Sequence, residues 1–228
     1  MDGGLPPEDF RFVGYRRKLI EDIRTRGVTD LEILSLFDQV PRHLFLPEGV
    51  WPRAYEDAPI PIGWGQTASQ PSLQALYLSV LRPTKDETVL EIGTGSGYLT
   101  ALLALMADRV YSVERVRELS TRARAALDTL RMKNVALLVG DGTIGWRKFA
   151  PYDVIVVSAA SPGVPTTLVD QLADPGRMLL PVGSLESQSL VLVTKEGGEV
   201  SETIVETNCT FVPLLGRFAW PEDRGPRE

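Results

Sequence analysis

Apolar residues recur at helical spacing near the start of the chain. Residues 8–26 place apolar side chains on one side of a predicted helix that stops at Gly27. A second helix is expected to begin at Thr29, because Thr29 and Glu32 have the spacing of a capping box. Its apolar positions continue in register until Pro41, which ends it. The chain therefore begins with two amphipathic helices.

Prolines and glycines dominate the stretch that follows. Residues 41–63 contain five prolines, which predicts irregular, extended chain. The next loop, GWGQTASQP (residues 63–71), carries no charge but many side chains that can form hydrogen bonds, unlike a plain surface loop. Pro71 suits the first position of a third helix that ends at Leu81, because its missing N–H costs nothing there.

From residue 83 onwards, short β-branched runs alternate with helical stretches. We expect strands at 88–92, 109–113, 134–139, 153–158 and 177–182, and helices at 97–107, 116–132 and 165–173. That alternation predicts an α/β fold with a doubly wound, mostly parallel, Rossmann-like sheet. Residues 189–208 differ, because they read as two strands joined through Gly197 and Gly198, which predicts a C-terminal antiparallel hairpin.

The chain is expected to form one compact domain with two parts. Residues 1–82 would supply N-terminal helices and a ligand-binding loop, packed on a core formed by residues 83–220. No linker separates these parts, and 228 residues suffice for one domain with a substantial core. Residues 221–228 are expected to form a disordered tail.

Composition narrows the classes of function. A net charge of −6 disfavours broad binding to nucleic acid, and the run Arg16, Arg17, Lys18 is interpreted as a solvated helix face. One cysteine and one histidine, Cys209 and His43, exclude an internal disulfide and a metal site built from several such ligands. The N-terminus lacks the apolar segment of a signal peptide, and no apolar run approaches ~18 residues. We therefore expect a cytoplasmic protein without a metal or a membrane partner.

A glycine-rich turn follows the first strand of the predicted sheet. The sequence VLEIGTGSGYLTALLA runs from a buried strand through Gly93, Gly95 and Gly97 into a helix. Glycines allow a sharp turn and the close approach of a ligand to the backbone, at the strand end where nucleotides bind. The spacing is related to the dinucleotide fingerprint, but Tyr98 stands where that pattern has its third glycine. A tight turn without a ligand is the alternative interpretation.

Acidic residues lie at or near the ends of three neighbouring strands. Glu91, Glu114 and Asp141 should form a negatively charged edge, with Glu114 positioned to accept hydrogen bonds from ribose hydroxyls. Asp141 can accept from an adenine amino group, while Gly142 offers its backbone. Such an edge repels a pyrophosphate and suits a cationic ligand, which favours S-adenosylmethionine over NAD.

At this point the sequence resembles the protein-L-isoaspartate O-methyltransferase family. The resemblance covers residues 15–216 and rests on VPRHLFLP, PIGWGQTASQP, VLEIGTGSGYLTALLA, VYSVE, GDGTIGW, PYDVIVVSAASPGVP, LLPVG and FVPLLG, in the family's order. The glycine motif alone would indicate a class I methyltransferase, whereas GQTASQP is far more specific. The resemblance implies transfer of a methyl group from S-adenosylmethionine to the α-carboxylate of isoaspartyl residues in damaged proteins and peptides.

The resemblance also implies roles for individual residues. The GQTASQP loop would close over the methionine end of the cofactor, with Ser69 as the active-site residue. The positions implied or predicted to bind the cofactor are Gln66, Thr67, Ala68, Ser69, Glu91, Gly93, Gly95, Gly97, Glu114, Asp141 and Gly142. Residues 158–162 would lie near the substrate. His43 is interpreted as structural, and Cys209 as buried and inert.

The implied reaction requires no general base, because an isoaspartyl α-carboxylate has a pKa below about 4 and is ionised at pH 7. The protein instead aligns oxygen, methyl carbon and sulfur and excludes water. A neutral hydroxyl such as that of Ser69 can orient the carboxylate. The resemblance implies that the methyl ester then collapses to a succinimide, whose hydrolysis returns part of the material to normal aspartate.

Three positions depart from the family's usual residues. Ala68 stands where isoleucine is frequent, Gln74 where some members have histidine, and Leu215 where many have threonine. These departures leave open a methyltransferase of ordinary aspartyl residues in a specific peptide. A non-catalytic S-adenosylmethionine-binding module and an NAD-dependent dehydrogenase are further alternatives, and a nucleic-acid methyltransferase is disfavoured. The expected partners are isoaspartyl proteins and peptides. The protein itself is expected to be a monomer.

Overall fold

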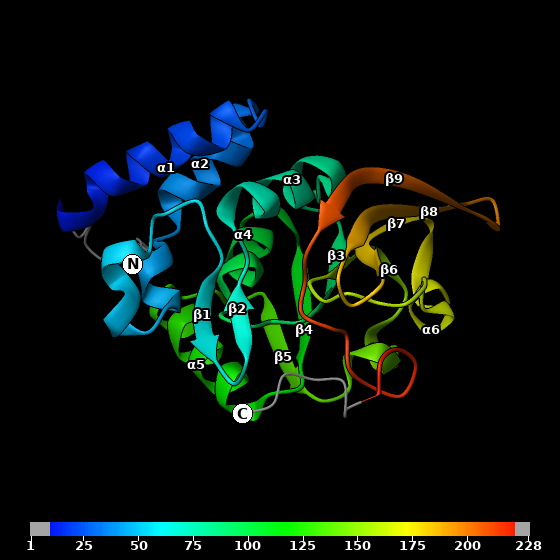
Figure 1. Ribbon diagram of the computed structural model, residues 1–228. Coiled ribbons are helices and arrows are strands. Elements are labelled where there is room, and N and C mark those ends of the chain that lie inside the picture. Colours follow the sequence, from blue (N-terminus) through cyan, green and yellow to red (C-terminus); the bar gives the residue numbers. More distant parts are fainter. Residues whose placement is uncertain (1–9, 222–228) are drawn as a thin grey trace.

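A seven-stranded sheet forms the centre of the molecule (Figure 1). The structure is a computed structural model, and it describes residues 10–221. The strand order is β5-β4-β3-β6-β7-β8-β9, with parallel pairing from β5 to β7 and antiparallel pairing of β7 with β8 and of β8 with β9. The predicted α/β class, with a mostly parallel sheet and antiparallel C-terminal strands, is confirmed.

Most predicted strands appear within a residue or two of their expected bounds. The strands of the sheet are β3 (Thr88–Ile92), β4 (Arg109–Glu114), β5 (Val135–Val139), β6 (Tyr152–Val157), β7 (Leu172–Gly183), β8 (Gln188–Glu196) and β9 (Glu199–Cys209). Strand β7 begins five residues earlier than expected. Gly197 and Gly198, with φ of +59° and +81°, form the two-residue connection of the β8–β9 hairpin, as predicted.

The helices divide between the two faces of the sheet. They are α1 (Val13–Thr25), α2 (Leu31–Gln39), α3 (Pro71–Leu81), α4 (Tyr98–Met106), α5 (Arg117–Thr129) and α6 (Thr166–Val169). On one face, the five helices from α1 to α5 pack against strand residues such as Val89 and form one hydrophobic core. On the other face, α6 packs against the strand residues that point the opposite way, such as Leu90, and forms a second core. Where a nine-residue helix was expected at 165–173, α6 spans a single turn, so 3₁₀ turns and the C-terminal segment cover much of the second face.

The N-terminal helices differ from the prediction in their caps and exposure. Asp30, not Thr29, caps α2, because its carboxylate accepts hydrogen bonds from the N–H groups of Glu32 and Ile33. Arg16 is buried and pairs with Asp38 of α2 at 2.8 Å, so the predicted solvated face of α1 does not include it. Residues 8 and 9 of the expected first helix lie outside the described residues.

The proline-rich stretch contains more structure than the extended chain that was predicted. It holds two 3₁₀ turns, Arg42–Phe45 and Glu48–Arg53. Strand β1 (Ile60–Gly63) then pairs with β2 (Gln66–Ala68) in a small hairpin apart from the main sheet (Figure 1). This hairpin carries the first half of the GQTASQP loop.

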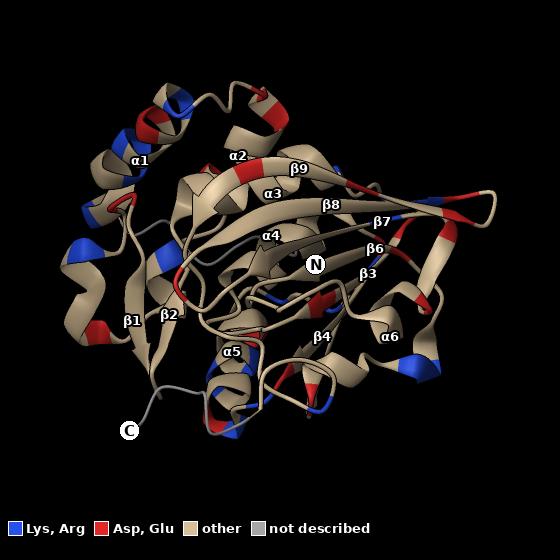
Figure 2. Ribbon diagram, turned by 45° about the vertical axis from the view of Figure 1, so that its right-hand side comes forward, with Lys and Arg blue, Asp and Glu red and all other residues tan. Residues whose placement is uncertain are grey.

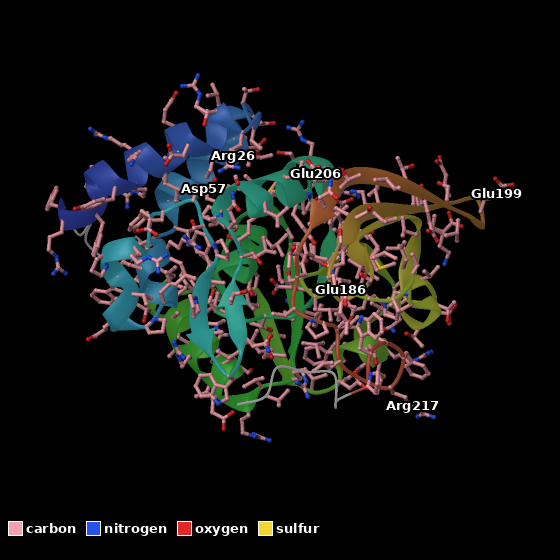
Figure 3. All side chains as sticks on the ribbon, in the orientation of Figure 1. Arg26, Asp57, Glu186, Glu199, Glu206 and Arg217 are labelled. Atoms are coloured by element: carbon pink, nitrogen blue, oxygen red, sulfur yellow. The ribbon has the colours of Figure 1, made fainter. Side chains whose placement is uncertain are left out.

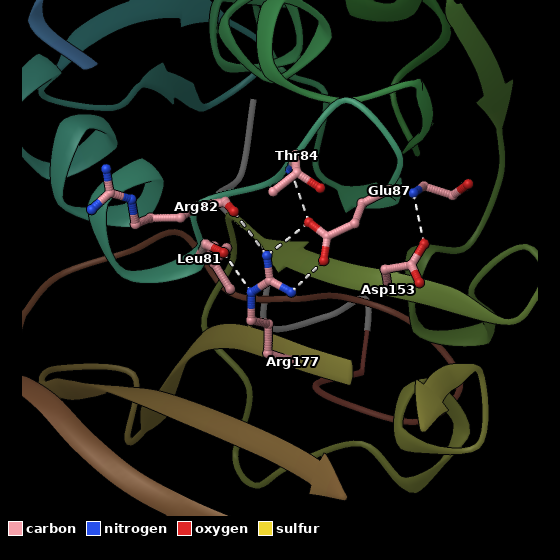
Figure 4. A network of polar contacts seen from close by, with 7 residues as sticks. Leu81, Arg82, Thr84, Glu87, Asp153 and Arg177 are labelled. Atoms are coloured by element: carbon pink, nitrogen blue, oxygen red, sulfur yellow. Dashed lines mark hydrogen bonds and ion pairs between the residues drawn. The ribbon is translucent and has the colours of Figure 1, made fainter. Parts of the chain in front are cut away.

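An arginine clamp joins β7 to the connection between α3 and β3 (Figure 4). Arg177 donates two hydrogen bonds to the Glu87 carboxylate, at 2.7 and 2.9 Å, and two more to the carbonyls of Leu81 and Arg82. These hydrogen bonds lower the pKa of Glu87. No local pattern predicts this ion pair, because its members are ninety residues apart.

Several expectations concern absences or residues beyond the described range. Within residues 10–221, no helix is long and apolar enough to cross a membrane, and no group of His, Cys, Asp and Glu side chains could hold a metal ion. Most of the expected tail, residues 222–228, lies outside the described part. The division at residue 82 stays a prediction, although one core contains residues from both sides of it.

Candidate functional site

A cavity lies beyond the carboxyl ends of the parallel strands, where ligands bind in open α/β sheets, and a second cavity adjoins it. The smaller, which we call the slot, follows the turn after β3 to the end of β4 and has about 70 Å³ of room. The larger, which we call the chamber, has about 740 Å³ and lies between α3, the α1–α2 connection and the end of β9. Thr67, Ser69, Ser158 and Val212 line both cavities and form their common boundary.

The glycine-rich turn forms the floor of the slot. Gly93 and Gly95 have φ of +93° and +54°, values that residues with side chains rarely adopt. A Cβ on Gly95 would meet only the Ile62 side chain, at 3.6 Å, so its slot side is open. Gly97 has another task, because a Cβ there would lie 2.9 Å from Cβ of Ala123 in α5. Gly97 therefore permits close packing and does not line the slot.

Glu114 lies at the end of β4 and lines the slot. Its side chain is 5% exposed, and its two oxygens accept hydrogen bonds from the N–H groups of Gly95 (2.8 Å) and Val116 (2.9 Å). Burial raises its pKa, and these two N–H groups oppose the shift. A carboxylate oxygen can accept more than one hydrogen bond, so Glu114 keeps acceptor capacity for a ligand.

Glu91 was also predicted to bind the cofactor; it is not among the residues that line the slot, and that role stays a prediction. It lies within β3, fully buried, and one oxygen accepts hydrogen bonds from the hydroxyls of Thr100 and Ser112, both at 2.6 Å. Burial raises its pKa to about 7. Glu91 thus joins α4 to β4 beneath the turn. The sequence predicted correctly that Glu91 lies in this strand, but it does not show which way the side chain points.

Asp141 was predicted to accept a hydrogen bond from adenine, and that role stays a prediction. One carboxylate oxygen accepts from the N–H and hydroxyl of Thr143, and the other accepts from the N–H of Arg217. Asp141 therefore ties the turn after β5 to the C-terminal segment and is not among the residues that line the slot. Its neighbour Gly142 does line the slot, and a Cβ there would lie 2.5 Å from the Ile92 side chain.

The β1–β2 hairpin covers one side of the slot. Gln66, Thr67 and Ala68 form β2 and line the slot. The hairpin is attached to α5 through Arg122, which donates to the Ile62 carbonyl at 2.9 Å and lies over the Trp64 ring, 5.6 Å from its centroid. The structure thus brings the predicted loop residues to the glycine turn.

Ser69 follows this hairpin and faces both cavities. Its carbonyl accepts a hydrogen bond from the buried Arg42, at 3.1 Å. Arg42 also donates to the carbonyls of residues 54, 56 and 58, so one guanidinium fixes two separate loops. The Ser69 hydroxyl has no hydrogen-bond partner within residues 10–221, and it remains able to bind a ligand.

Asp57 holds the other end of the same loop. Its carboxylate accepts from the N–H of Ser72, at 2.8 Å, and from the Gln70 side chain, at 3.0 Å, and so anchors the start of α3. Sequence reasoning missed both Arg42 and Asp57. The signal that could have revealed them is that they are charged residues in a stretch that supplies core residues such as Phe45 and Ile60.

The three departures from the usual family residues all line the slot. Ala68 and Leu215 are apolar and buried there. Gln74, on α3, is 5% exposed, and its side-chain oxygen has no hydrogen-bond partner within the described residues. A buried acceptor without a partner is costly, so a donor from a ligand would stabilise it.

His43 and Cys209, which were interpreted as a structural residue and a buried, inert one, are both buried. His43 is buried, stacks on Phe12 and shares a hydrogen bond with the Tyr55 hydroxyl at 2.8 Å. Cys209 is buried at the end of β9 and lines the chamber, and burial raises the pKa of its thiol. Its inertness stays a prediction.

Comparisons with known proteins agree on one family. The pattern of the family described as protein-L-isoaspartate(D-aspartate) O-methyltransferase matches residues 15–219. Protein-L-isoaspartate O-methyltransferase 1 of Pelobacter propionicus is 48% identical over 209 residues, 90% of this chain and 97% of that protein. A solved protein-L-isoaspartate O-methyltransferase matches with a TM-score of 0.79 and 31% identity, over 90% of this chain and 67% of the other. A Plasmodium falciparum structure assigned to the same activity, in complex with S-adenosyl-L-homocysteine, matches with a TM-score of 0.77 and 26% identity, over 88% and 98%.

Proposed function

Because the chain belongs to the protein-L-isoaspartate(D-aspartate) O-methyltransferase family, we propose that the slot is its methyl-donor site and the chamber its acceptor site. The enzyme transfers a methyl group from S-adenosylmethionine to the α-carboxylate of isoaspartyl residues, which initiates repair through a succinimide. The observation that carries this assignment is the boundary shared by the two cavities. A methyl group can pass between two ligands only where their sites meet, and Ser69 lies there.

The residues of the slot fit an adenosyl sulfonium. The open backbone at Gly95 offers a cradle that a side chain would fill. Glu114 has acceptor capacity for ribose hydroxyls, and Gly142 presents backbone at the end of β5. The side-chain oxygen of Gln74, which has no hydrogen-bond partner within the described residues, can accept a hydrogen bond from the ligand. The slot as it stands is narrow, so we expect the β1–β2 hairpin to move outward during binding.

The reaction needs alignment more than acid–base chemistry. When bound, the sulfonium supplies an electrophilic methyl group. The Ser69 hydroxyl donates a hydrogen bond to the acceptor carboxylate and fixes the oxygen that attacks. Arg42 donates a hydrogen bond to the Ser69 carbonyl and so holds the backbone that carries the hydroxyl. His43 is buried in an aromatic cluster and lines neither cavity, in keeping with a carboxylate that is already ionised.

The chamber suits a segment of polypeptide. Its volume is within the range of sites that enclose ligands of several hundred daltons, and hydroxyl or amide side chains line much of it. We assign isoaspartyl proteins and peptides as the acceptors, with no role for nucleic acid or a membrane. We further propose that the enzyme acts as a monomer in the cytoplasm, which size-exclusion chromatography and cell fractionation would test.

Replacement of Ser69 tests the assignment of the boundary. Ser69→Ala should lower kcat/KM for an isoaspartyl peptide by about 10- to 150-fold, since a hydrogen bond to a charged group contributes about 1.5–3 kcal/mol. Its affinity for S-adenosylhomocysteine should change little. Ser79→Ala is a matched control, because the Ser79 hydroxyl also lines the chamber but is already bound to the Ala75 carbonyl. Equal activity of Ser69→Ala and wild type would remove Ser69 from the mechanism.

A further inference from the structure

Among residues 10–221, two cations and two anions line the chamber, but their ion pairs leave one anion without a cationic partner. Within the described residues they are Arg26, Asp30, Arg82 and Glu206. Arg82 and Asp30 pair with each other at 2.5 Å. Arg26 lies 3.4 Å from the buried carboxylate of Asp57. Glu206 accepts a hydrogen bond from the N–H of Thr207, but no lysine or arginine within residues 10–221 forms an ion pair with it. The chamber therefore presents one uncompensated negative charge.

The position of Glu206 follows from irregular pairing in the last strand. Strand β9 is the edge of the sheet and pairs only with β8. Ile204 faces Val191, but Glu206 faces Leu190, so β9 has one extra residue between these pairs. A β-bulge of this kind redirects the side chains that follow it. The bulge brings the end of β9, from Glu206 onwards, over the chamber, while the earlier part of the strand does not line it.

The other acidic residues of β9 lie elsewhere. Strand β9 carries negative charge along its length (Figure 2), from Glu199, Glu202 and Glu206. Glu199 lies at the tip of the projecting hairpin, whereas Glu206 lies near α3, on the same side of the molecule as Arg26 (Figure 3). Only Glu206 of these three lines the chamber. An effect of the protein's overall charge on the acceptor should therefore arise equally from all three glutamates. An effect inside the chamber should arise from Glu206 alone.

We infer that Glu206 makes the chamber selective for acceptor segments that carry lysine or arginine close to the isoaspartyl residue. This inference rests on the assignment of the chamber as the acceptor site. A basic side chain there would meet a carboxylate without a competing cation, whereas an acidic side chain would meet like charge. Long flexible side chains can reach this rim from more than one position of an extended peptide. Glu206 is exposed, so the preference is modest and sensitive to salt.

The test uses isoaspartyl peptides that are identical except for one flanking position, which is lysine or glutamate. Pairs with the change at each position around the isoaspartate are compared by kcat/KM. For at least one position the wild-type ratio of lysine to glutamate peptide should exceed one, by up to about fivefold. The ratio should shrink between about 0.01 M and about 1 M salt, because the Debye length falls from about 30 to about 3 Å.

Two variants separate the local effect from the global one. Glu206→Gln should bring the ratio close to one, and Glu206→Lys should invert it. Glu199→Gln changes the net charge by the same amount as Glu206→Gln and should keep the wild-type ratio. A wild-type ratio of one at every position, or one that survives in Glu206→Gln, would overturn the inference. If no isoaspartyl peptide is methylated at all, the acceptor assignment fails, and the selectivity falls with it.

Discussion

Replacement of Arg42 by lysine should weaken the fold and the methyl transfer together. The Arg42 side chain is fully buried, and its guanidinium donates four hydrogen bonds to backbone carbonyls, of which one is that of Ser69. Burial lowers its pKa to about 10, so the group remains charged at pH 7. A lysine keeps the charge but offers three donors from a single nitrogen, which cannot reach four carbonyls in two loops.

The magnitude follows from the bonds that lysine cannot replace. A hydrogen bond to a charged group contributes about 1.5–3 kcal/mol, so the loss of one or two lowers the free energy of unfolding by about 1.5–6 kcal/mol. For a chain of this length that corresponds to a fall in Tm of about 3–24 °C. A shift of the Ser69 loop by about 1 Å can cost about 100-fold in kcat, because the acceptor oxygen is then misaligned.

Thermal unfolding and methyl transfer to an isoaspartyl peptide, measured on the same preparation below Tm, check both parts. Affinity for S-adenosylhomocysteine, measured by calorimetry, should fall less than kcat, since the four hydrogen bonds of Arg42 go to carbonyls of residues 54, 56, 58 and 69 and not to the glycine turn. Lys18→Arg, on the exposed side of α1, is a control for lysine–arginine exchange as such. A variant Arg42→Lys that unfolds with wild-type Tm and retains wild-type kcat would refute the reasoning.

Three further predictions concern single groups. Glu114→Gln should weaken S-adenosylhomocysteine binding by about 5- to 30-fold in calorimetry, since a hydrogen bond to a charged acceptor contributes about 1–2 kcal/mol more than one to a neutral acceptor. Unchanged affinity would show that Glu114 does not bind the ligand. Arg177 lowers the pKa of Glu87, so the clamp stabilises the protein above the ordinary glutamate pKa and is lost as pH falls through the lowered value. Denaturant unfolding should therefore show Glu87→Gln less stable than wild type at pH 7, with the gap closing as the pH falls below the ordinary glutamate pKa and through the lowered value; a gap independent of pH would contradict this. Cys209 has a raised thiol pKa and lines the chamber, so maleimide labelling followed by mass spectrometry should be slow at pH 7, faster at alkaline pH and slowed further by an isoaspartyl peptide; labelling indifferent to peptide would place the acceptor elsewhere.

The sequence was informative where local pattern decides structure. The third helix was predicted at its observed bounds because Pro71 and the apolar run mark both ends. The glycine turn was placed correctly because positive φ at Gly93 and Gly95 leaves little choice of residue. The resemblance to a known family supplied the role of the GQTASQP loop, which no periodicity contains.

The sequence was uninformative where long-range contacts decide. Glu91 and Asp141 were predicted to bind the cofactor. In the structure one oxygen of each carboxylate accepts a hydrogen bond from a distant group, the Ser112 hydroxyl and the Arg217 N–H, and strand position does not reveal such partners. Arg42 was passed over because its carbonyl partners come from residues up to 27 positions away. Short-range patterns therefore located the site, whereas its supporting contacts required the fold.

The most direct test of the account is methyl transfer from labelled S-adenosylmethionine to an isoaspartyl peptide and to its normal aspartyl twin. The account predicts base-labile label on the isoaspartyl peptide alone, because its α-carboxylate is free to accept the methyl group, whereas in the normal aspartyl peptide the α-carboxyl forms the peptide bond. Label on both peptides, or on the aspartyl peptide alone, would contradict the assignment of the chamber as a site for isoaspartyl residues.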